Sequence, residues 1–316
     1  MTVVGESFEV VTMGRVGVDL YPEQIGVPLE DVRTFRKSLG GSPTNVAVAA
    51  ARLGHRAAVI TKVGNDGFGK YVRAALRSFG VDDRFVGTHA ELLTPVVFAE
   101  VFPPNDFPLH FYRQPTAPDM TLSIDELDLD TIREAEIFWT TGTGLSDEPS
   151  RSTTLAALRA RDKAGHTVHD LDYRPMLWPS LNAASQYQTE ALAFATVAVG
   201  NQDESAVVVG EAAPSEQARR LLDLGVEWAI VKLGPEGVFV ASRSETAHIP
   251  AVEVEIVCGL GAGDAFGGAV CHGLLRGWGA AETVAFANAA GAHVAARLAC
   301  ADEMPTEEQV RSLMAP

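Results

Sequence analysis

The chain has 316 residues, of which 47% are hydrophobic, and its 25 Lys and Arg against 41 Asp and Glu give a formal net charge of −16. This length and composition describe a folded α/β protein of one large domain or two smaller ones, and exclude a disordered chain. The negative charge argues against nucleic acid and anionic membranes as partners, because both require local positive charge. An acidic small molecule stays possible if a few arginines gather in one pocket.

The cysteines and the first residues predict a reduced, cytoplasmic protein. Cys258, Cys271 and Cys300 come late in the chain and lack the spacing of metal ligands. The start has no basic segment followed by a long apolar one, and no run reaches the roughly 18 apolar residues of a membrane span. We therefore expect neither export nor membrane insertion.

Residues 8–18 alternate apolar and small residues and predict an opening strand. Asp19 follows at the strand end, where it is either a solvated loop acid or a ligand-binding carboxylate. Segment 39–45, Leu-Gly-Gly-Ser-Pro-Thr-Asn, precedes a small apolar helix. Ser42 fits the N-cap of that helix, and the glycine pair lets a ligand approach the backbone, with Asn45 directed to the same place.

A nucleotide-binding P-loop is suggested and then excluded after the buried-type strand 58–63. Gly64 and Lys70 have the right spacing, but Tyr71 stands where a Mg²⁺-binding Ser or Thr is required. We interpret the segment as a turn in which Asp66 caps the next helix.

The pattern changes between residues 84 and 113, where no long helical period fits. The short β-like pieces 84–86, 95–102 and 109–112 predict a small antiparallel sheet. Together with parts of 10–40, parts of 84–113 could form a lid. Arg113 is either a surface residue lying along apolar groups or an anion clamp.

From about residue 130 the chain alternates strands and helices, which predicts a mainly parallel sheet with helices on both faces. Ligands bind at the carboxyl ends of such strands. The expected strands are 137–140, 167–170, 196–200 and 229–233, and the helices lie around 149–164, 182–191 and 215–224. Further helices are expected at 280–298 and 306–314.

Two loops of this region have alternative interpretations. Asn201 and Glu204 have the spacing of a helix capping box, and equally suit a hydrated Mg²⁺. Gly234 and Gly237 are either part of a ligand-binding loop or the hairpin turn between two strands.

The glycine-rich stretch 259–268 follows a β-like run, 252–257, and opens a helix that runs to Gly277. A strand that breaks at glycines and enters a helix presents unpaired N–H groups at the positive end of the helix dipole, which predicts an anion site. Asp264 lies in the first turn. It either stabilises the dipole or does chemistry beside a bound phosphate.

Taken together, residues 40–45 (Gly-Gly-Ser-Pro-Thr-Asn) and 261–266 (Gly-Ala-Gly-Asp-Ala-Phe) resemble the two signatures of the ribokinase/PfkB carbohydrate kinases, and the similarity runs from about residue 8 to 314. The resemblance implies a single kinase domain over residues 1–316, a doubly wound sheet and a β lid. It also implies ATP-dependent transfer of the γ-phosphoryl group to a sugar hydroxyl.

The resemblance assigns roles by position. Asp264 would be the base, assisted by the N–H groups of Gly261, Ala262 and Gly263, while Asn201 and Glu204 would organise Mg²⁺ through water. The other positions are the sugar-binding Asp19, Gly41 and Asn45, the ATP-phosphate residues Lys232, Gly234 and Gly237, and Asn288 near the adenine.

Two loops that contain arginine narrow the range of expected substrates. Segments 112–118 and 171–178, with 24–32 of the lid, resemble those of kinases for keto sugar acids. Arg113 and Arg174 would hold the carboxylate, because planar bidentate donors suit it. The expected substrate is 5-dehydro-2-deoxygluconate of inositol catabolism, with 2-keto-3-deoxygluconate or a neutral sugar as alternatives.

The resemblance leaves other points open. Many members carry Asp-Thr-Thr, tied to a monovalent cation, where this chain has Cys258-Gly259-Leu260, so K⁺ dependence is open. A homodimer through the lid is possible. A sugar-acid-binding sensor would have no use for Asp264, and a dehydrogenase is disfavoured because the glycines lack Gly-x-Gly-x-x-Gly spacing.

Overall fold

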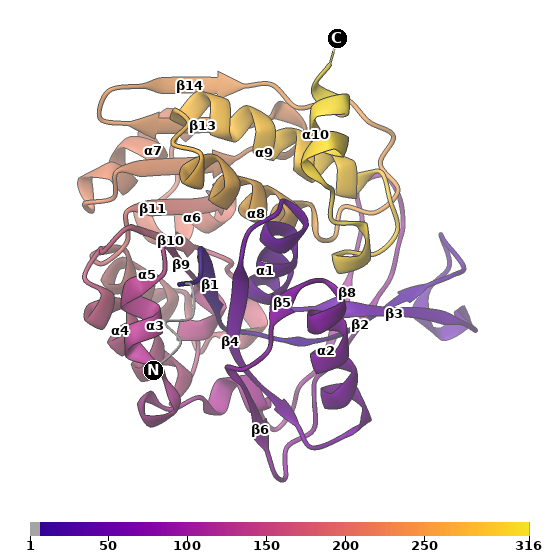
Figure 1. The fold of residues 1–316 in the computed structure, drawn as a ribbon. Helices are drawn as coiled ribbons and strands as arrows, with labels where there is room; N and C mark the ends of the chain where they lie inside the picture. Colours follow the sequence, from indigo (N-terminus) through magenta and orange to yellow (C-terminus); the bar gives the residue numbers. More distant parts are fainter. Residues whose placement is uncertain (1–6, 316) are drawn as a thin grey trace.

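The computed structural model describes residues 7–315, which form two β-sheets with helices packed around the larger one (Figure 1). The strands are β1 Val10–Met13, β2 Gly17–Pro22, β3 Phe35–Gly40, β4 Ala57–Gly64, β5 Val81–Asp82, β6 Val86–His89, β7 Val96–Ala99, β8 Leu109–Tyr112, β9 Ile137–Thr141, β10 His166–Asp170, β11 Val197–Asn201, β12 Trp228–Lys232, β13 Val238–Ser242 and β14 Thr246–Ile249. The α-helices are α1 Ser42–Arg52, α2 Gly67–Ser78, α3 Leu129–Glu134, α4 Ser150–Arg161, α5 Leu181–Leu192, α6 Gln202–Val209, α7 Pro214–Asp223, α8 Ala262–Leu275, α9 Ala280–Ala295 and α10 Glu307–Met314.

The larger sheet has ten strands in the order β14-β13-β12-β11-β10-β9-β1-β4-β5, with β6 beside β4. All pairs are parallel except β12–β13 and β13–β14 at one edge. The chain builds outward from β1 to β4 and β5, then returns to the other side of β1 with β9. Such a reversal opens a crevice at the carboxyl ends of the two central strands, and the candidate site lies there.

Helices cover both faces of this sheet, as expected for a doubly wound fold (Figure 1). Adjacent residues of β1 point to opposite faces: Val10 belongs to the core beneath α1, α8 and α9, and Val11 to the core beneath α4 and α5. The helices α1 and α8 can approach closely because Gly268 has no side chain; a Cβ at this position would overlap Ala49. Their N-termini therefore lie side by side. No helix within residues 7–315 is long and apolar enough to cross a membrane.

The smaller sheet has the order β3-β2-β7-β8 and is separate from the main one. A small sheet of this kind was expected, with two differences. Strands β2 and β7 pair in parallel, while the other two pairs are antiparallel. The piece at 84–86 leads into β6, which joins the main sheet through β4 and takes no part in the small one.

The expected strand 8–18 is two strands in different sheets. The break falls at Gly14, which has a φ of +141° that residues with a side chain rarely adopt. The N–H of Gly14 donates a hydrogen bond to the carbonyl of Ile60. After the break, β2 crosses to the small sheet. The apolar alternation continues across both strands because each is buried, so the pattern did not reveal the crossing.

Two other expectations are wrong in their local detail. Residues 252–257 form no strand; Val252, Val254 and Ile256 line a cavity and are half-buried, and the alternation arises because the glutamates between them are exposed. The N-cap of α1 is Gly41, not Ser42. Helix α6, directly after β11, begins at the capping box that the spacing of Asn201 and Glu204 suggested. Asp66 does cap α2, accepting a hydrogen bond from the N–H of Gly69 at 2.7 Å.

Candidate active site

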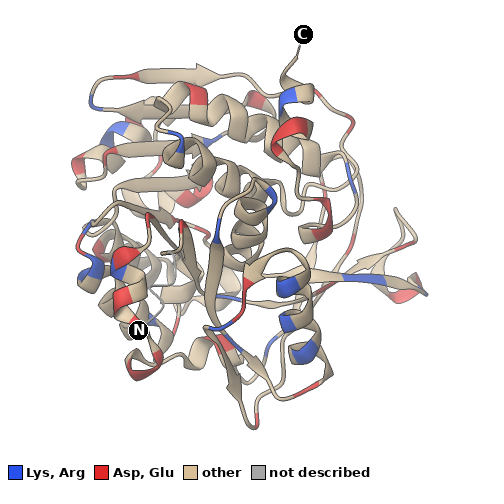
Figure 2. Ribbon diagram, viewed as in Figure 1, with Lys and Arg blue, Asp and Glu red and all other residues tan. Residues whose placement is uncertain are grey.

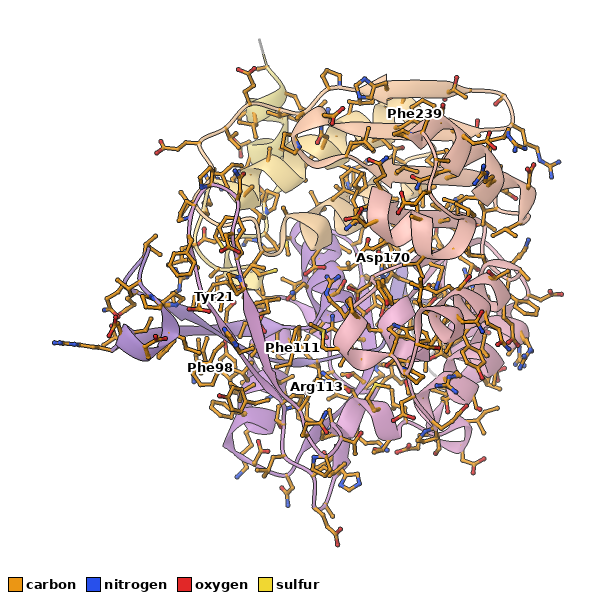
Figure 3. The ribbon with its side chains drawn as sticks, turned by 180° about the vertical axis from the view of Figure 1, so that it is seen from behind. Tyr21, Phe98, Phe111, Arg113, Asp170 and Phe239 are labelled. Carbon is orange, nitrogen blue, oxygen red and sulfur yellow. The ribbon has the colours of Figure 1, made fainter. Side chains whose placement is uncertain are left out.

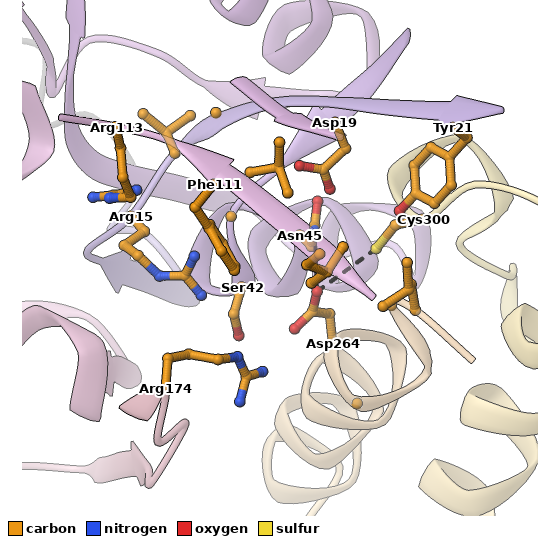
Figure 4. A pocket seen from close by; sticks show the side chains of 18 of the residues that line it. Arg15, Asp19, Tyr21, Ser42, Asn45, Phe111, Arg113, Arg174, Asp264 and Cys300 are labelled. Carbon is orange, nitrogen blue, oxygen red and sulfur yellow. Dashed lines mark hydrogen bonds between the residues drawn. The ribbon is translucent and has the colours of Figure 1, made fainter. Parts of the chain in front are cut away.

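A cavity of about 200 Å³ lies between the small sheet, the N-termini of α1 and α8, and the loops after β1, β8 and β10 (Figure 4). The sequence-predicted residues that line it are Asp19, Gly41, Asn45, Arg113, Arg174, Gly261, Gly263 and Asp264. They come from segments far apart in the chain, and the fold brings them together. Viewed from behind, Tyr21 and Phe98 lie in the small sheet, and Arg113 lies near its border with the main body (Figure 3).

Two glycines make room for this cavity. Gly41 has a φ of +98°, and a Cβ there would overlap the carbonyl of Arg15. A Cβ at Gly40 would overlap the carboxylate of Asp19. The glycine pair is therefore required by close approach of neighbouring protein groups, and through them it shapes the ligand cavity.

Asp264 occupies the first turn of α8, whose N-cap Gly261 has the left-handed φ of +84°. Its carboxylate accepts a hydrogen bond from Nδ2 of Asn45 at 2.8 Å and faces the thiol of Cys300 at 3.6 Å. Burial raises the pKa of Asp264, against the opposing effect of hydrogen bonds from Asn45 and Ser42. The N–H of Gly263 has no hydrogen bond to residues 7–315, as expected of a helix N-terminus that can receive an anion.

Asp19 faces the same cavity from β2. Burial raises its pKa to about 7, with the nearby Asp264 acting in the same direction and Arg15 against it. A carboxyl with this pKa changes its charge near neutral pH, so it can either accept or donate a hydrogen bond to a hydroxyl.

Arg15 is a residue that the sequence reasoning missed. It follows β1, inside the segment expected to be continuous strand, and its guanidinium lines the cavity. Its Nε donates to Oγ1 of Thr143 at 3.0 Å and its Nη2 to Asp172 at 3.2 Å. A charged residue within an apolar run that ends a central strand was the available signal.

The predicted arginines are both paired with protein acids. Arg113 contacts Asp119 at 2.6 Å, and both side chains are buried. Arg174 contacts Asp172 at 2.9 Å and Glu204 at 3.2 Å, and its side chain keeps 35% exposure. Acidic and basic residues are interspersed along the ribbon (Figure 2), but these arginines meet in one pocket of an acidic protein.

Asp172 organises this group. It accepts hydrogen bonds from Nη2 of Arg15 and from the hydroxyl of Thr143, the latter at 2.8 Å, and it forms an ion pair with Arg174. Burial alone would raise the pKa of Asp172, but Arg174 and Arg15 hold it well below its ordinary value. Its φ of +24° is uncommon for a residue with a side chain, and the three contacts help to keep it there.

A second, more apolar cavity of about 740 Å³ lies behind the first, between the loop after β12, segment 251–259 and α9. Of the predicted nucleotide residues, Lys232, Gly234, Gly237 and Asn288 line it. Gly234 and Gly237 also form the turn between the antiparallel β12 and β13, so the hairpin interpretation of that pair is confirmed, and their place beside the cavity leaves the ligand-binding interpretation a prediction. Asn288 donates to the carbonyl of Pro250 at 2.6 Å.

The two cavities meet at the N-terminus of α8, because Gly259 and Gly263 line both. Lys232 lies at this junction, about 3.5 Å from where a Cβ of Gly263 would be. Burial acts to lower the pKa of Lys232, but the carboxylates of Asp170 and Glu204 outweigh it and raise that pKa. The junction thus holds a protonated amine beside the free N–H of Gly263.

Asn201 and Glu204 form a capping box on α6. The side chain of Asn201 accepts the N–H of Glu204 and the carboxylate of Glu204 accepts the N–H of Asn201, both at 2.8 Å. Neither lines the two cavities, although Glu204 is tied to the first through Arg174. Within residues 7–315 no group of three or more His, Cys, Asp or Glu could hold a metal ion.

Comparison with known proteins gives a consistent result. The family model for the pfkB family carbohydrate kinases matches residues 7–307. A curated 5-dehydro-2-deoxygluconokinase of Clostridium perfringens is 32% identical over 97% of this chain and 93% of its own. The solved aminoimidazole riboside kinase from Salmonella enterica, complexed with aminoimidazole riboside and an ATP analogue, is 26% identical with a TM-score of 0.80, covering 97% of this chain and 99% of its own. A putative ribokinase II from E. coli, in complex with ATP and Mg²⁺, is 23% identical with a TM-score of 0.88 over 97% and 99% of the two chains, and shares the fold.

Proposed function

The chain belongs to the pfkB family of carbohydrate kinases, and from this premise we propose that it transfers the γ-phosphoryl group of ATP to the terminal hydroxyl of a keto-deoxy sugar acid. The observation that carries the proposal is the junction of two cavities at the N-terminus of α8, with Asp264 on the sugar side and Lys232 on the nucleotide side. An acceptor and a phosphoryl donor bound in these cavities would meet at Asp264 and the free N–H of Gly263.

The chemistry follows from this placement. The acceptor hydroxyl attacks the γ-phosphorus, the bond from that phosphorus to the ADP oxygen breaks, and Asp264 takes the hydroxyl proton. The raised pKa of Asp264 favours this role, because a more basic carboxylate is a better proton acceptor. The N–H groups of Gly261, Ala262 and Gly263 would stabilise charge on the transferring group, and that of Ala262 also donates a long hydrogen bond, 3.4 Å, to the carbonyl of Gly259.

The nucleotide cavity suits ATP. Apolar side chains such as Val238, Val252 and Ala292 would enclose the adenine near Asn288, and Lys232 would face the phosphates. Bound Mg²⁺ would neutralise part of the phosphate charge. Asn201 and Glu204 already satisfy each other, which supports a contact to Mg²⁺ through water rather than direct ligation.

The substrate class rests on the arginines. Three guanidinium groups line a sugar-sized cavity, and a carboxylate on the substrate would accept their unused donors, whereas a neutral sugar would not need them. The named 5-dehydro-2-deoxygluconokinase relative makes 5-dehydro-2-deoxygluconate the first candidate. In this arrangement Asp19, Gly41 and Asn45 would contact the sugar hydroxyls.

The small sheet would act as the lid, and also offers a surface for a homodimer. Strands β3 and β8 are its edges, and Tyr112 of β8 is 63% exposed. Sedimentation of the wild type and of Tyr112→Glu would test dimer formation, with Leu181→Glu, another exposed apolar position at 58%, as the control. A monomeric wild type would contradict it.

The decisive experiment for the function is a kinase assay with ATP and Mg²⁺ across ketoses, aldoses and keto-deoxy aldonates. We expect turnover to be greatest with a keto-deoxy aldonate. Activity confined to neutral sugars would reject the substrate class and leave the kinase chemistry in place.

A further inference from the structure

We propose that Arg15 is a specificity-determining residue that binds the carboxylate of the substrate. The inference rests on the proposed function, in that it concerns an acidic acceptor. Arg15 leaves the central strand β1 at the point where the strand order reverses, and only 7% of its side chain is exposed. It is held in a fixed place on a rigid element, as a selective contact requires.

The side chain of Arg15 is oriented by the protein but not saturated by it. Thr143 accepts from its Nε, Asp172 accepts from its Nη2, and the same Thr143 hydroxyl donates to Asp172. A guanidinium has five N–H donors. Besides these hydrogen bonds of Nε and Nη2, Nη1 of Arg15 makes no hydrogen bond to residues 7–315. This buried cation therefore keeps N–H donors for an acceptor in the cavity.

The positive charge of Arg113 beside Arg15 would also favour binding of an anion in this pocket. Arg113 lies close enough that the positive charge of Arg15 helps burial to lower the pKa of Arg113, against the pull of Asp119. Two neighbouring cations in a buried pocket repel each other, and an anion bound between them would relieve that repulsion. Of the acids paired with these arginines, Asp119 contacts Arg113, and Asp172 is shared between Arg15 and Arg174.

Arg15 is better placed for this task than Arg174. Arg174 spends Nη1 on the Tyr173 carbonyl and on Glu204, and Nη2 on Asp172. In Figure 4 the guanidinium of Arg15 points into the pocket between Arg113 and the Ser42–Asp264 side. In a sugar acid the carboxylate and the terminal hydroxyl are at opposite ends, so a hydroxyl at Asp264 directs the carboxylate toward the arginines.

The test compares Arg15→Gln with the wild type in steady-state assays with a keto-deoxy aldonate and with a neutral ketose. A charge-assisted hydrogen bond contributes enough for its loss to raise KM for the acid by roughly 10- to 100-fold. The KM for the neutral ketose and the KM for ATP should stay within about twofold. Arg15→Lys should recover only part of the acid affinity, because an ammonium is a point charge without the planar fork.

Thr143→Val keeps the shape of the side chain but removes the acceptor for Nε of Arg15. It should raise KM for the acid several-fold and leave kcat nearly unchanged, as expected for a residue that positions Arg15. Arg243→Gln, which removes an exposed arginine in the β13–β14 turn, is the matched charge control and should change neither constant. Thermal unfolding of each variant confirms that it is folded.

Equal increases in KM for acid and neutral acceptors in folded Arg15→Gln would overturn the inference and leave the proposed function standing. If that variant does not fold, unchanged acid KM values in both Arg15→Lys and Thr143→Val overturn it. A wild type that phosphorylates only neutral sugars rejects the acid substrate itself, and Arg15 as its carboxylate contact falls with it.

Discussion

Asp19 and Asp264 show how one cavity gives two carboxyl groups different surroundings. Burial raises the pKa of both, but Asp264 is held by Asn45 and Asp19 has no hydrogen bond of its side chain to residues 7–315. The fixed carboxylate suits a base that must meet one hydroxyl. The unpartnered one suits a contact that the substrate completes.

Replacement of Asp264 by Asn should abolish turnover without unfolding the protein. We expect kcat to fall by roughly 10² to 10⁴, the usual loss for a general base. The raised pKa of Asp264 shows that its buried charge is unfavourable. A neutral amide avoids this cost, so the melting temperature should not fall. Assays of ADP formation and thermal unfolding check both statements; a variant with full activity would remove Asp264 from the mechanism.

Asp19 should make the protein less stable as pH rises toward 7. Its folded-state pKa of about 7 lies above the ordinary 3.8, so ionisation disfavours the folded state. The cost is absent below about pH 4, grows from there to pH 7, and is constant above. Asp19→Asn removes this ionisation cost. In urea unfolding, the variant should therefore have a higher unfolding free energy than the wild type at pH 8, and this difference should disappear toward pH 4.

Asp66 provides a control of opposite sign. Its pKa is lowered, because hydrogen bonds from Thr94 and Gly69 outweigh burial. Stability from this group is present above pH 4 and lost as pH falls through the lowered pKa. Asp66→Asn should therefore be less stable than the wild type at pH 8, with a deficit that shrinks in acid. Parallel pH profiles for the two variants would contradict both assignments.

At the scale of elements, the loop before α8 depends on glycine for reasons of space as well as conformation. A Cβ on Gly261 would overlap the thiol of Cys300, and a Cβ on Gly259 would come 3.0 Å from the ring of Phe107. The loop is thus clamped between the segment after α9 and the turn between β7 and β8. This packing aims the N-terminus of α8 at the junction of the two cavities.

Gly261→Ala should damage both folding and catalysis. We expect a loss of more than about 2 kcal/mol in unfolding free energy, from the left-handed backbone and the overlap with Cys300 together. Gly277→Ala is the matched control: its φ is +69°, but nothing lies within 4 Å of the added Cβ, so it should lose about 1 kcal/mol and keep kcat. Equal losses in the two variants would show that crowding at Gly261 is unimportant.

At the scale of the molecule, the small sheet reaches over both cavities. Its strands supply Asp19 and Phe111 to the first, and the turn between β7 and β8 supplies Pro104, Asn105 and Phe107 to the second. Phe107 also packs on the main core. One sheet therefore borders both cavities, as the proposed lid over acceptor and nucleotide would require.

Phe107→Ala should weaken this cover. Loss of about 1 kcal/mol of apolar contact predicts a KM for ATP about fivefold higher, with a larger share of ATP hydrolysed without acceptor because water reaches the junction. Coupled assays with and without sugar measure both. Leu181→Ala, at a position on α5 that is 58% exposed and outside the small sheet, is the control and should leave the ratio unchanged. An unchanged ratio in Phe107→Ala would count against the covering role.

Much of this was accessible from local patterns. The helices at α4, α5, α7 and α8 and the strands from β9 to β12 were predicted within a few residues, because their periodicity reports burial on one or two faces. The crossing of the chain between the two sheets at Gly14 and the absence of a strand at 252–257 were not predicted. An alternation of apolar residues looks the same in one strand or in two, and beside a sheet or beside a cavity. Arg15 and Asp119 were given no role, and Asp172 was quoted only within segment 171–178, because pairings such as that of Arg15 with Asp172 join residues far apart in the chain.

The sequence by itself determined two glycine-rich helix starts, and from them stretch 259–268 predicted an anion site with a carboxylate beside it and stretch 39–45 predicted close approach of a ligand, because glycine and a helix start constrain the backbone locally. Only the tertiary structure decided which groups share that site. The reversal of strand order at β1 brings Arg15, Arg113 and Arg174 into one cavity with Asp264, and it pairs each of them with a particular acid. Those contacts join residues far apart in the chain, and their geometry follows from how the two sheets pack.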